Sequence, residues 1–139
     1  MSDADRHRDE LVERLFAAGL GMAEILTVYL GDTLGLYRAL DRAGAMTAPQ
    51  LAGEAGIFPR YAREWLEQQA AAGIVTVDDV SAEPDERRYE LPPGHAEPLL
   101  QPESPYSIAP FCKSFVAVAG VMPELVAPFR SGGPVPWQA

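Results

Sequence analysis

The feature that most constrains this chain is a change of hydrophobic period between residues 47 and 91. A capping box predicts a short helix, with Thr47 as the N-cap and Gln50 able to reach back to it, and Gly56 ends that helix. Pro59 then opens a second helix that stops at Gly73. The apolar face of this second helix comprises Ala62, Trp65, Leu66 and Ala70.

After Gly73 the pattern changes from helical to strand-like. Ile74 to Val77 is rich in β-branched residues, residues 78–86 are polar turn material, and Arg88 to Leu91 can return as a second strand. Helix, turn, helix and two-stranded hairpin is the order of a winged-helix unit. We therefore predict a mainly α fold, with a winged helix-turn-helix and a small β-hairpin wing in residues 44–91 and further helices on both sides.

Residues 1–43 are predicted to form N-terminal helices that build a dimer. From Asp9 to Leu40 the apolar residues keep helical spacing, which predicts one long helix ending at Ala43. Its apolar stripe is wide enough to bury one face in the chain's own core and another against a second chain. Gly31 and Gly35 either admit a close neighbour or bend the helix. The candidate dimer contacts are Leu11, Leu15, Met22, Leu26, Tyr29 and Leu30.

Residues 92–131 are predicted to form C-terminal helices interrupted by proline, since eleven of the 13 prolines lie from Pro84 onward. We expect an amphipathic helix after Lys113 that continues beyond a kink at Pro123. Phe111, Phe115 and Met122 are expected to lie in the core rather than in a ligand pocket, and a small-ligand site among them stays open as an alternative. Residues 132–139 form a linker-like tail that includes Trp137.

The composition predicts a cytoplasmic protein. With 11 basic and 20 acidic residues the chain carries a net charge of −9, which gives no general attraction to nucleic acid or anionic lipid. The single cysteine, Cys112, cannot form an internal disulfide and is expected to be a small buried hydrophobe. The uncharged runs are shorter than the ~20 residues of a spanning helix, so we expect no membrane partner.

The sequence predicts no catalytic, cofactor or metal residue in this chain. Gly-rich turns do not follow a strand, and His7, His95 and Cys112 do not have metal-ligand spacing. For His95 we expect a structural role, in which its ring hydrogen-bonds a local carbonyl group.

DNA binding is the alternative that the winged-helix pattern raises. Residues 47–91 hold nine acidic and four basic residues, a net charge of −5 on the unit that would touch phosphates, so nucleic acid is an unfavoured partner. Arg60 and Arg63, at the start of the second helix, are predicted to pair with Glu64 and Glu67 at helical spacing. If the chain is instead a winged-helix transcriptional regulator, these two arginines are its candidate DNA contacts.

Four strings and the tail together carry a resemblance to a known family. They are Tyr29–Tyr37 (YLGDTLGLY), Arg60–Leu66 (RYAREWL), Gln69–Ile74 (QAAAGI), Leu91–Ala96 (LPPGHA) and Phe129–Trp137 (FRSGGPVPW). In this order they resemble the N-terminal region of bacterial class I S-adenosylmethionine-dependent methyltransferases that carry a winged-helix domain ahead of the catalytic domain. The resemblance extends from about Glu13 to Trp137.

The resemblance implies a non-catalytic role. In that family the N-terminal domain builds the dimer and its later helices help to close the substrate cavity, whereas the cofactor and the chemistry belong to a Rossmann-like domain. That domain is missing from this sequence, so S-adenosylmethionine is expected only there. We therefore expect a dimerisation and substrate-lid module of a truncated or split family member, with Phe111, Phe115 and Met122 as candidate lid residues. Its expected partners are a second copy of the chain and a separately encoded methyltransferase domain.

Overall fold

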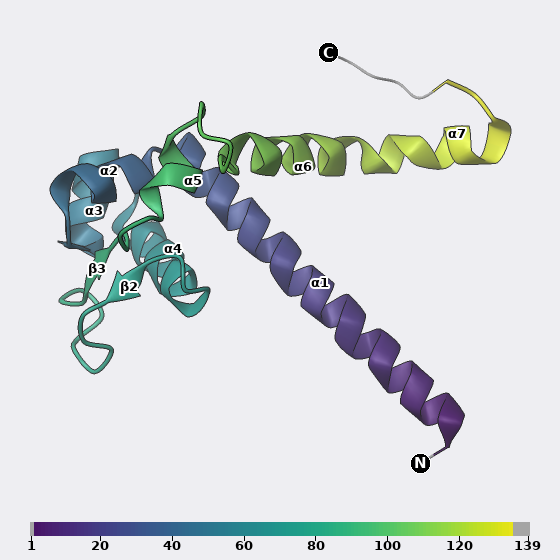
Figure 1. Cartoon of the computed structure of the whole chain (residues 1–139), viewed down its shortest axis with the longest axis horizontal. Helices are drawn as coiled ribbons and strands as arrows, with labels where there is room; N and C mark the ends of the chain where they lie inside the picture. Colours follow the sequence, from purple (N-terminus) through teal and green to yellow (C-terminus); the bar gives the residue numbers. More distant parts are fainter. Residues whose placement is uncertain (1, 135–139) are drawn as a thin grey trace.

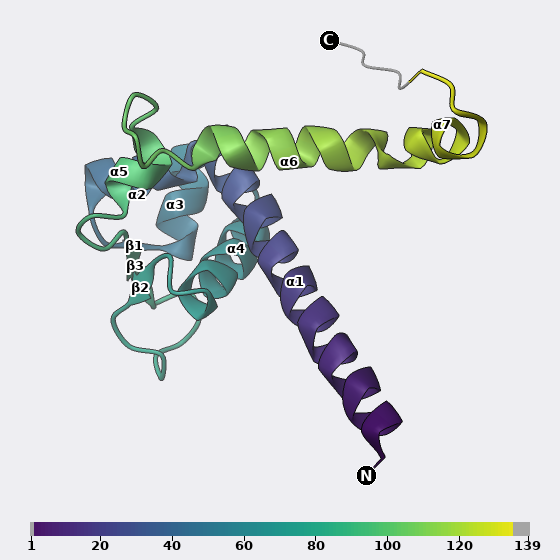
Figure 2. The same cartoon turned by 45° about the vertical axis from the view of Figure 1, so that its right-hand side comes forward.

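A computed structural model describes residues 2–134 of the chain; Trp137 and most of the predicted tail lie outside the described residues. A body of short helices and a small sheet carries two long helical arms that diverge from it (Figures 1 and 2). The first arm is α1 (Asp3–Thr33), and the second is formed by α6 (Ala109–Val121), the 3-10 turn η1 (Met122–Leu125) and α7 (Val126–Ser131). The mainly α winged-helix fold predicted from the sequence is confirmed.

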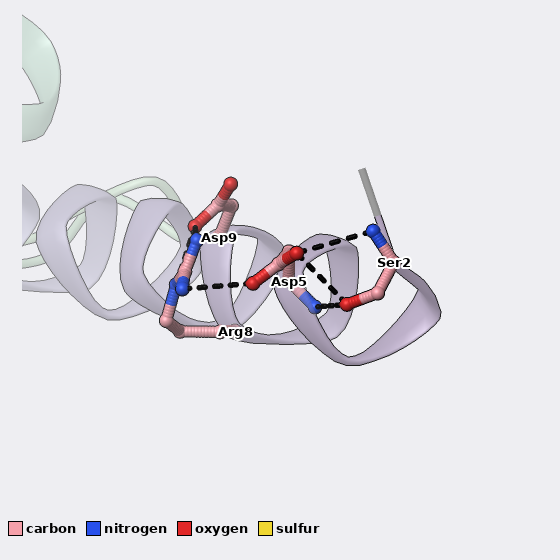
Figure 3. Close-up of polar contacts among 4 residues, drawn as sticks. All are labelled: Ser2, Asp5, Arg8 and Asp9. Carbon is pink, nitrogen blue, oxygen red and sulfur yellow. Dashed lines mark hydrogen bonds and ion pairs between the residues drawn. The ribbon is translucent and has the colours of Figure 1, made fainter.

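The start of α1 is stabilised by contacts within its own first turns (Figure 3). The hydroxyl of Ser2 accepts a hydrogen bond from the Asp5 backbone N–H, and the Asp5 carboxylate accepts one from the Ser2 backbone N–H, each at 3.1 Å. The Ser2 hydroxyl also donates to the Asp5 carboxylate at 2.8 Å, and this bond, together with the one from the Ser2 backbone N–H, lowers the pKa of Asp5. Arg8 pairs with Asp5 at 3.1 Å and with Asp9 at 2.8 Å. The helix therefore has a defined beginning although its first turns lie in solvent.

The two glycines of the long apolar run have different roles. Gly35 adopts a left-handed conformation, with φ of 71°, so α1 ends at Thr33 and α2 (Leu36–Ala43) starts in a new direction. The predicted single helix to Ala43 is therefore wrong. At Gly31 a β-carbon would lie 2.5 Å from the Trp65 ring, so this glycine admits a close neighbour.

The helix-turn-helix is formed by α3 (Ala48–Ala55) and α4 (Pro59–Ala71). Thr47 caps α3 and forms the predicted capping box with Gln50, and Gly56, with φ of 66°, ends the helix. Pro59 occupies the first turn of α4, where its missing N–H costs nothing. The local signals in the sequence therefore placed both helices correctly.

The wing belongs to a three-stranded antiparallel sheet in the order β1-β3-β2. β3 (Arg88–Glu90) pairs with β2 (Thr76–Val77) as the predicted hairpin, with Thr76 opposite Glu90. β3 also pairs with β1 (Met46–Thr47), and Met46 lies opposite Tyr89. The sequence predicted only the hairpin, because β1 is two residues long and runs directly into the α3 cap.

The core joins α1 and the helices of the body through a buried polar network. The Trp65 indole N–H donates to the Thr27 carbonyl at 2.9 Å, and the Gln69 side-chain amide donates to the Thr27 hydroxyl at 3.1 Å. The Tyr37 hydroxyl donates to the Gln69 side-chain carbonyl. Gln69 and Tyr37 are fully buried, so these bonds satisfy polar groups that water cannot reach. Besides Tyr37, the hydrophobic residues with the least exposure are Leu36, Leu40, Ala48, Leu51, Ala62, Leu66 and Tyr89.

The second arm is one helix over residues 109–131 that is long and apolar enough, by length and composition alone, to cross a membrane. It begins at Ala109, before the expected start after Lys113, and the helical turn η1 continues it past Pro123, as expected. Its N-terminal end is docked on the body, where Ala109 and Cys112 are buried. The absence of a membrane partner stays a prediction. Between the wing and this arm lies the short helix α5 (Ala96–Leu100).

Candidate functional site

The first arm carries the predicted dimer contacts on α1, whose N-terminal half projects from the body (Figure 1). Every residue from Leu11 to Leu20 is exposed, and Phe16 is 68% exposed. Of the six candidates, Leu11, Leu15, Leu26 and Leu30 are exposed, and Met22 and Tyr29 are half-buried. These exposed apolar side chains on one long helix form a candidate interaction surface.

The second arm carries a similar exposed line of apolar side chains. The rings of Phe111 and Phe115 lie 4.5 Å apart between centroids, yet both side chains are exposed, as is Met122. The expectation that these three residues lie in the core is therefore wrong, because each is between 39% and 52% exposed. Further along the arm, Val126 is 51% and Phe129 is 86% exposed.

A buried carboxylate connects the two arms where they meet the body. Asp32, near the end of α1, is 6% exposed; its Oδ2 lies 2.8 Å from Lys113 Nζ on α6, and its Oδ1 lies 3.5 Å from Arg38 Nη2 on α2. Next to this junction, burial raises the pKa of the Cys112 thiol, and the Asp32 charge raises it further. Cys112 is 2% exposed, as predicted for a small buried hydrophobe. Asp32 thus anchors the start of the second arm to the first.

The arginines of the helix-turn-helix take part in ion pairs. Arg60 pairs with Glu64 at 2.7 Å, as predicted. Arg63 pairs instead with Asp85 in the wing, 3.6 Å away, so its predicted pairing with Glu67 is wrong. Glu67 pairs with Arg87 of the wing at 3.3 Å. These last two pairs join the wing to α4, and the acidic partners lower the positive potential of the helix that would enter a DNA groove.

An apolar groove of about 430 Å³ lies between α1 and α4. Leu30 on α1 and Leu34, which caps that helix, form one side, and Tyr61 and Trp65 on α4 form the other. Leu30, Leu34 and Tyr61 are exposed, whereas Trp65 is buried. The groove is completed by Thr27, Leu36, Ile57, Glu64 and Gln68. The sequence did not indicate this groove, since its walls come from segments about thirty residues apart.

Titratable groups in residues 2–134 do not gather into a metal site, and the described part of the chain contains no such cluster of His, Cys, Asp and Glu. His95 has the structural role expected for it, because its Nδ1 lies 2.9 Å from a backbone oxygen. That oxygen belongs to Ile74, 21 residues away, rather than to a local residue. The His95 side chain thus connects the start of α5 to the segment that follows α4 by a hydrogen bond.

A helix-turn-helix followed by a β-hairpin wing defines a winged-helix domain. The chain belongs to the Rv2258c-like winged HTH domain family, whose model matches residues 22–101. Its fold is similar to that of PigF with SAH, at a TM-score of 0.63 and 18% identity. The match covers 94% of this chain but 34% of PigF, so the chain spans about a third of that protein's length.

Two further solved structures overlap less well with this chain. RV1404 from Mycobacterium tuberculosis has a TM-score of 0.43 and 14% identity, with 96% of this chain and 97% of that chain covered. A MarR family transcription regulator, SP03579, has a TM-score of 0.42 and 17% identity, with 93% and 89% covered. No curated protein matches the sequence.

Proposed function

We propose that this chain is a non-catalytic dimerisation and substrate-lid module of an S-adenosylmethionine-dependent methyltransferase. The observation that carries the proposal is the pair of helical arms with uncovered apolar faces, which project from an acidic winged helix (Figure 2). An isolated helix is only marginally stable in water, because most helical stability in proteins comes from packing an apolar face. The exposed N-terminal half of α1 would therefore be stabilised by packing against a partner. A second copy of the chain supplies the same apolar face.

The lid part of the proposal rests on the second arm. Phe111, Phe115 and Met122 are exposed at helical spacing on this arm, so they offer apolar surface to a covering domain. The similar solved structure is PigF with SAH, and SAH is the product that S-adenosylmethionine leaves after methyl transfer. We propose that a methyltransferase domain outside these residues covers this surface. The substrate of that domain would then contact the rings of Phe111 and Phe115.

The cofactor would be held by that other domain. Within residues 2–134 the strands are two or three residues long and antiparallel, so the residues present do not fit a nucleotide-type cofactor, which needs a strand leading into a Gly-rich turn. We therefore assign no catalytic or cofactor residue to this chain.

A matched pair of valines tests the dimer. Val12 on α1 is 59% exposed and Val80 on the wing is 71% exposed, so Val→Asp at either position leaves the fold intact. Sedimentation velocity from about 1 to 100 μM, which brackets the affinity of a weak dimer, should show a dimer for the wild type and for Val80→Asp, but a monomer for Val12→Asp. A wild-type chain that stays monomeric over the whole range would refute the proposal.

DNA binding is the second candidate, and the winged-helix fold together with the exposed Arg60 side chain favours it. Fluorescence anisotropy with labelled genomic duplexes tests it at moderate salt. We expect no saturable binding, because residues 47–91 carry a net charge of −5, which DNA phosphates repel. Salt-sensitive binding that is lost in Arg60→Ala and Arg63→Ala would establish the regulator in place of the methyltransferase module.

A further inference from the structure

One line of side chains on α1 has the pattern of a helix–helix seam. Its members are spaced alternately by four and three residues, as in a heptad repeat. The four large members, from Val12 to Leu30, are between 39% and 68% exposed. At the two small members, Gly19 and Ala23, nothing bulky would hold a second helix away. The seam consists of Val12, Phe16, Gly19, Ala23, Leu26 and Leu30.

The seam is symmetric about residue 21. Val12 and Leu30 are equally far from this point, as are Phe16 and Leu26, and Gly19 and Ala23 flank it. When a second copy of α1 is turned end for end about this centre, large side chains meet large ones and small meet small. A two-fold dimer requires this kind of self-complementarity.

The groove between α1 and α4 distinguishes the antiparallel arrangement from the parallel one. Leu30 belongs to both the seam and the groove wall. In an antiparallel pair, Val12 and Phe16 of the partner subunit come to lie beside Leu30 and the open side of the groove. A parallel pair leaves each groove open and brings two acidic winged units together at the same end, where their charges repel.

We infer that two copies of this chain pair through antiparallel α1 helices that cross at Gly19 and Ala23, so that each α1 covers the other copy's groove between α1 and α4. This inference rests on the dimerisation proposed above. It adds which face of α1 forms the interface, the relative direction of the two helices and their register. It also accounts for the length of α1, because residues before Leu20 lie beyond the body of their own copy (Figure 1).

Cysteine pairs test direction and register together. In the double variant Val12→Cys/Leu30→Cys the two thiols of one chain are 18 residues apart on one helix, about 27 Å, so a disulfide can only join two chains. Both positions are exposed, and the native Cys112 is buried and does not compete. Mild oxidation should give a covalent dimer on non-reducing gels for the double variant, and monomers for each single variant and the wild type.

The outcomes separate this inference from the proposed function. A covalent dimer from Val12→Cys alone would show a parallel pair and overturn the inference. A dimer in sedimentation that gives no disulfide in the double variant would overturn the register while the dimerisation stands. A monomer at all concentrations would overturn both.

Gly19→Leu, with Gly53→Leu as its control, provides a second test that does not depend on oxidation. In the described part of the chain nothing lies within 4 Å of a β-carbon at either glycine, so both variants should fold. Leucine at the crossing should raise the dimer dissociation constant about tenfold or more, since the helices can no longer approach. Leucine at Gly53 on α3 should leave it unchanged. Tighter association of Gly19→Leu would indicate unspecific apolar contact and contradict the inference.

Discussion

Replacing Gly31 by alanine tests how tightly α1 packs on the winged helix. A β-carbon at this position would lie 2.5 Å from Trp65 Cζ2 and 2.6 Å from Tyr37 Cε2. The two rings already meet edge to face, with centroids 5.1 Å apart, and each also holds a hydrogen bond that limits its movement. One of the rings must therefore move before the methyl group fits.

The free energy of unfolding of Gly31→Ala should be lower than that of the wild type, although alanine is a better helix former than glycine. Overpacking a core costs about 1–3 kcal/mol, and loss of one buried hydrogen bond adds about 1 kcal/mol. Alanine returns about 1 kcal/mol of helix propensity relative to glycine. We therefore expect Gly31→Ala to be less stable than the wild type by about 1–3 kcal/mol.

Gly53→Ala is the matched control, because this helical glycine is exposed and nothing in residues 2–134 lies within 4 Å of its β-carbon. It should be more stable than the wild type by about 0.5–1 kcal/mol. Urea unfolding followed by circular dichroism measures both variants, at one protein concentration because association shifts the midpoint. If Gly31→Ala equals or exceeds the wild type in stability while Gly53→Ala behaves as expected, the close packing at Gly31 is refuted.

Three more predictions concern buried polar groups. Burial raises the pKa of Tyr37 above its ordinary value of 10.0, so the stability from its neutral form is complete below that pH and falls as the pH rises above it; Tyr37→Phe should reduce this fall in urea titrations. Burial raises the pKa of the Cys112 thiol, so iodoacetamide at pH 8 should alkylate the folded chain at least about tenfold more slowly than the unfolded chain. Lys113→Met leaves the buried Asp32 carboxylate with Arg38 as its cation, and should speed amide hydrogen exchange in residues 109–116 but not in α4.

The parts of the fold that local chemistry determines could be predicted from the sequence. Thr47 and Gln50 cap α3, Gly56 ends it and Pro59 starts α4, each through contacts within a few residues. These signals need no knowledge of the rest of the fold, and so the winged helix was recognisable from spacing alone.

The features that depend on distant segments could not be predicted. Gly35 is compatible with a helix or with a left-handed turn, and only packing of α2 on the body selects the turn. The pairing of Arg63 with Asp85 depends on where the wing folds back. For Phe111 and Phe115 the spacing predicted an apolar stripe correctly, but spacing does not say whether the same chain covers that stripe.

Sedimentation equilibrium of the purified wild-type chain tests the central claim, that this winged helix is a module for pairing, most directly. At micromolar concentrations we predict a mass of twice the 15.0 kDa of the single chain for the wild type and for Val80→Asp. For Val12→Asp we predict the mass of the single chain. A mass of 15.0 kDa for the wild type at every concentration would contradict the account.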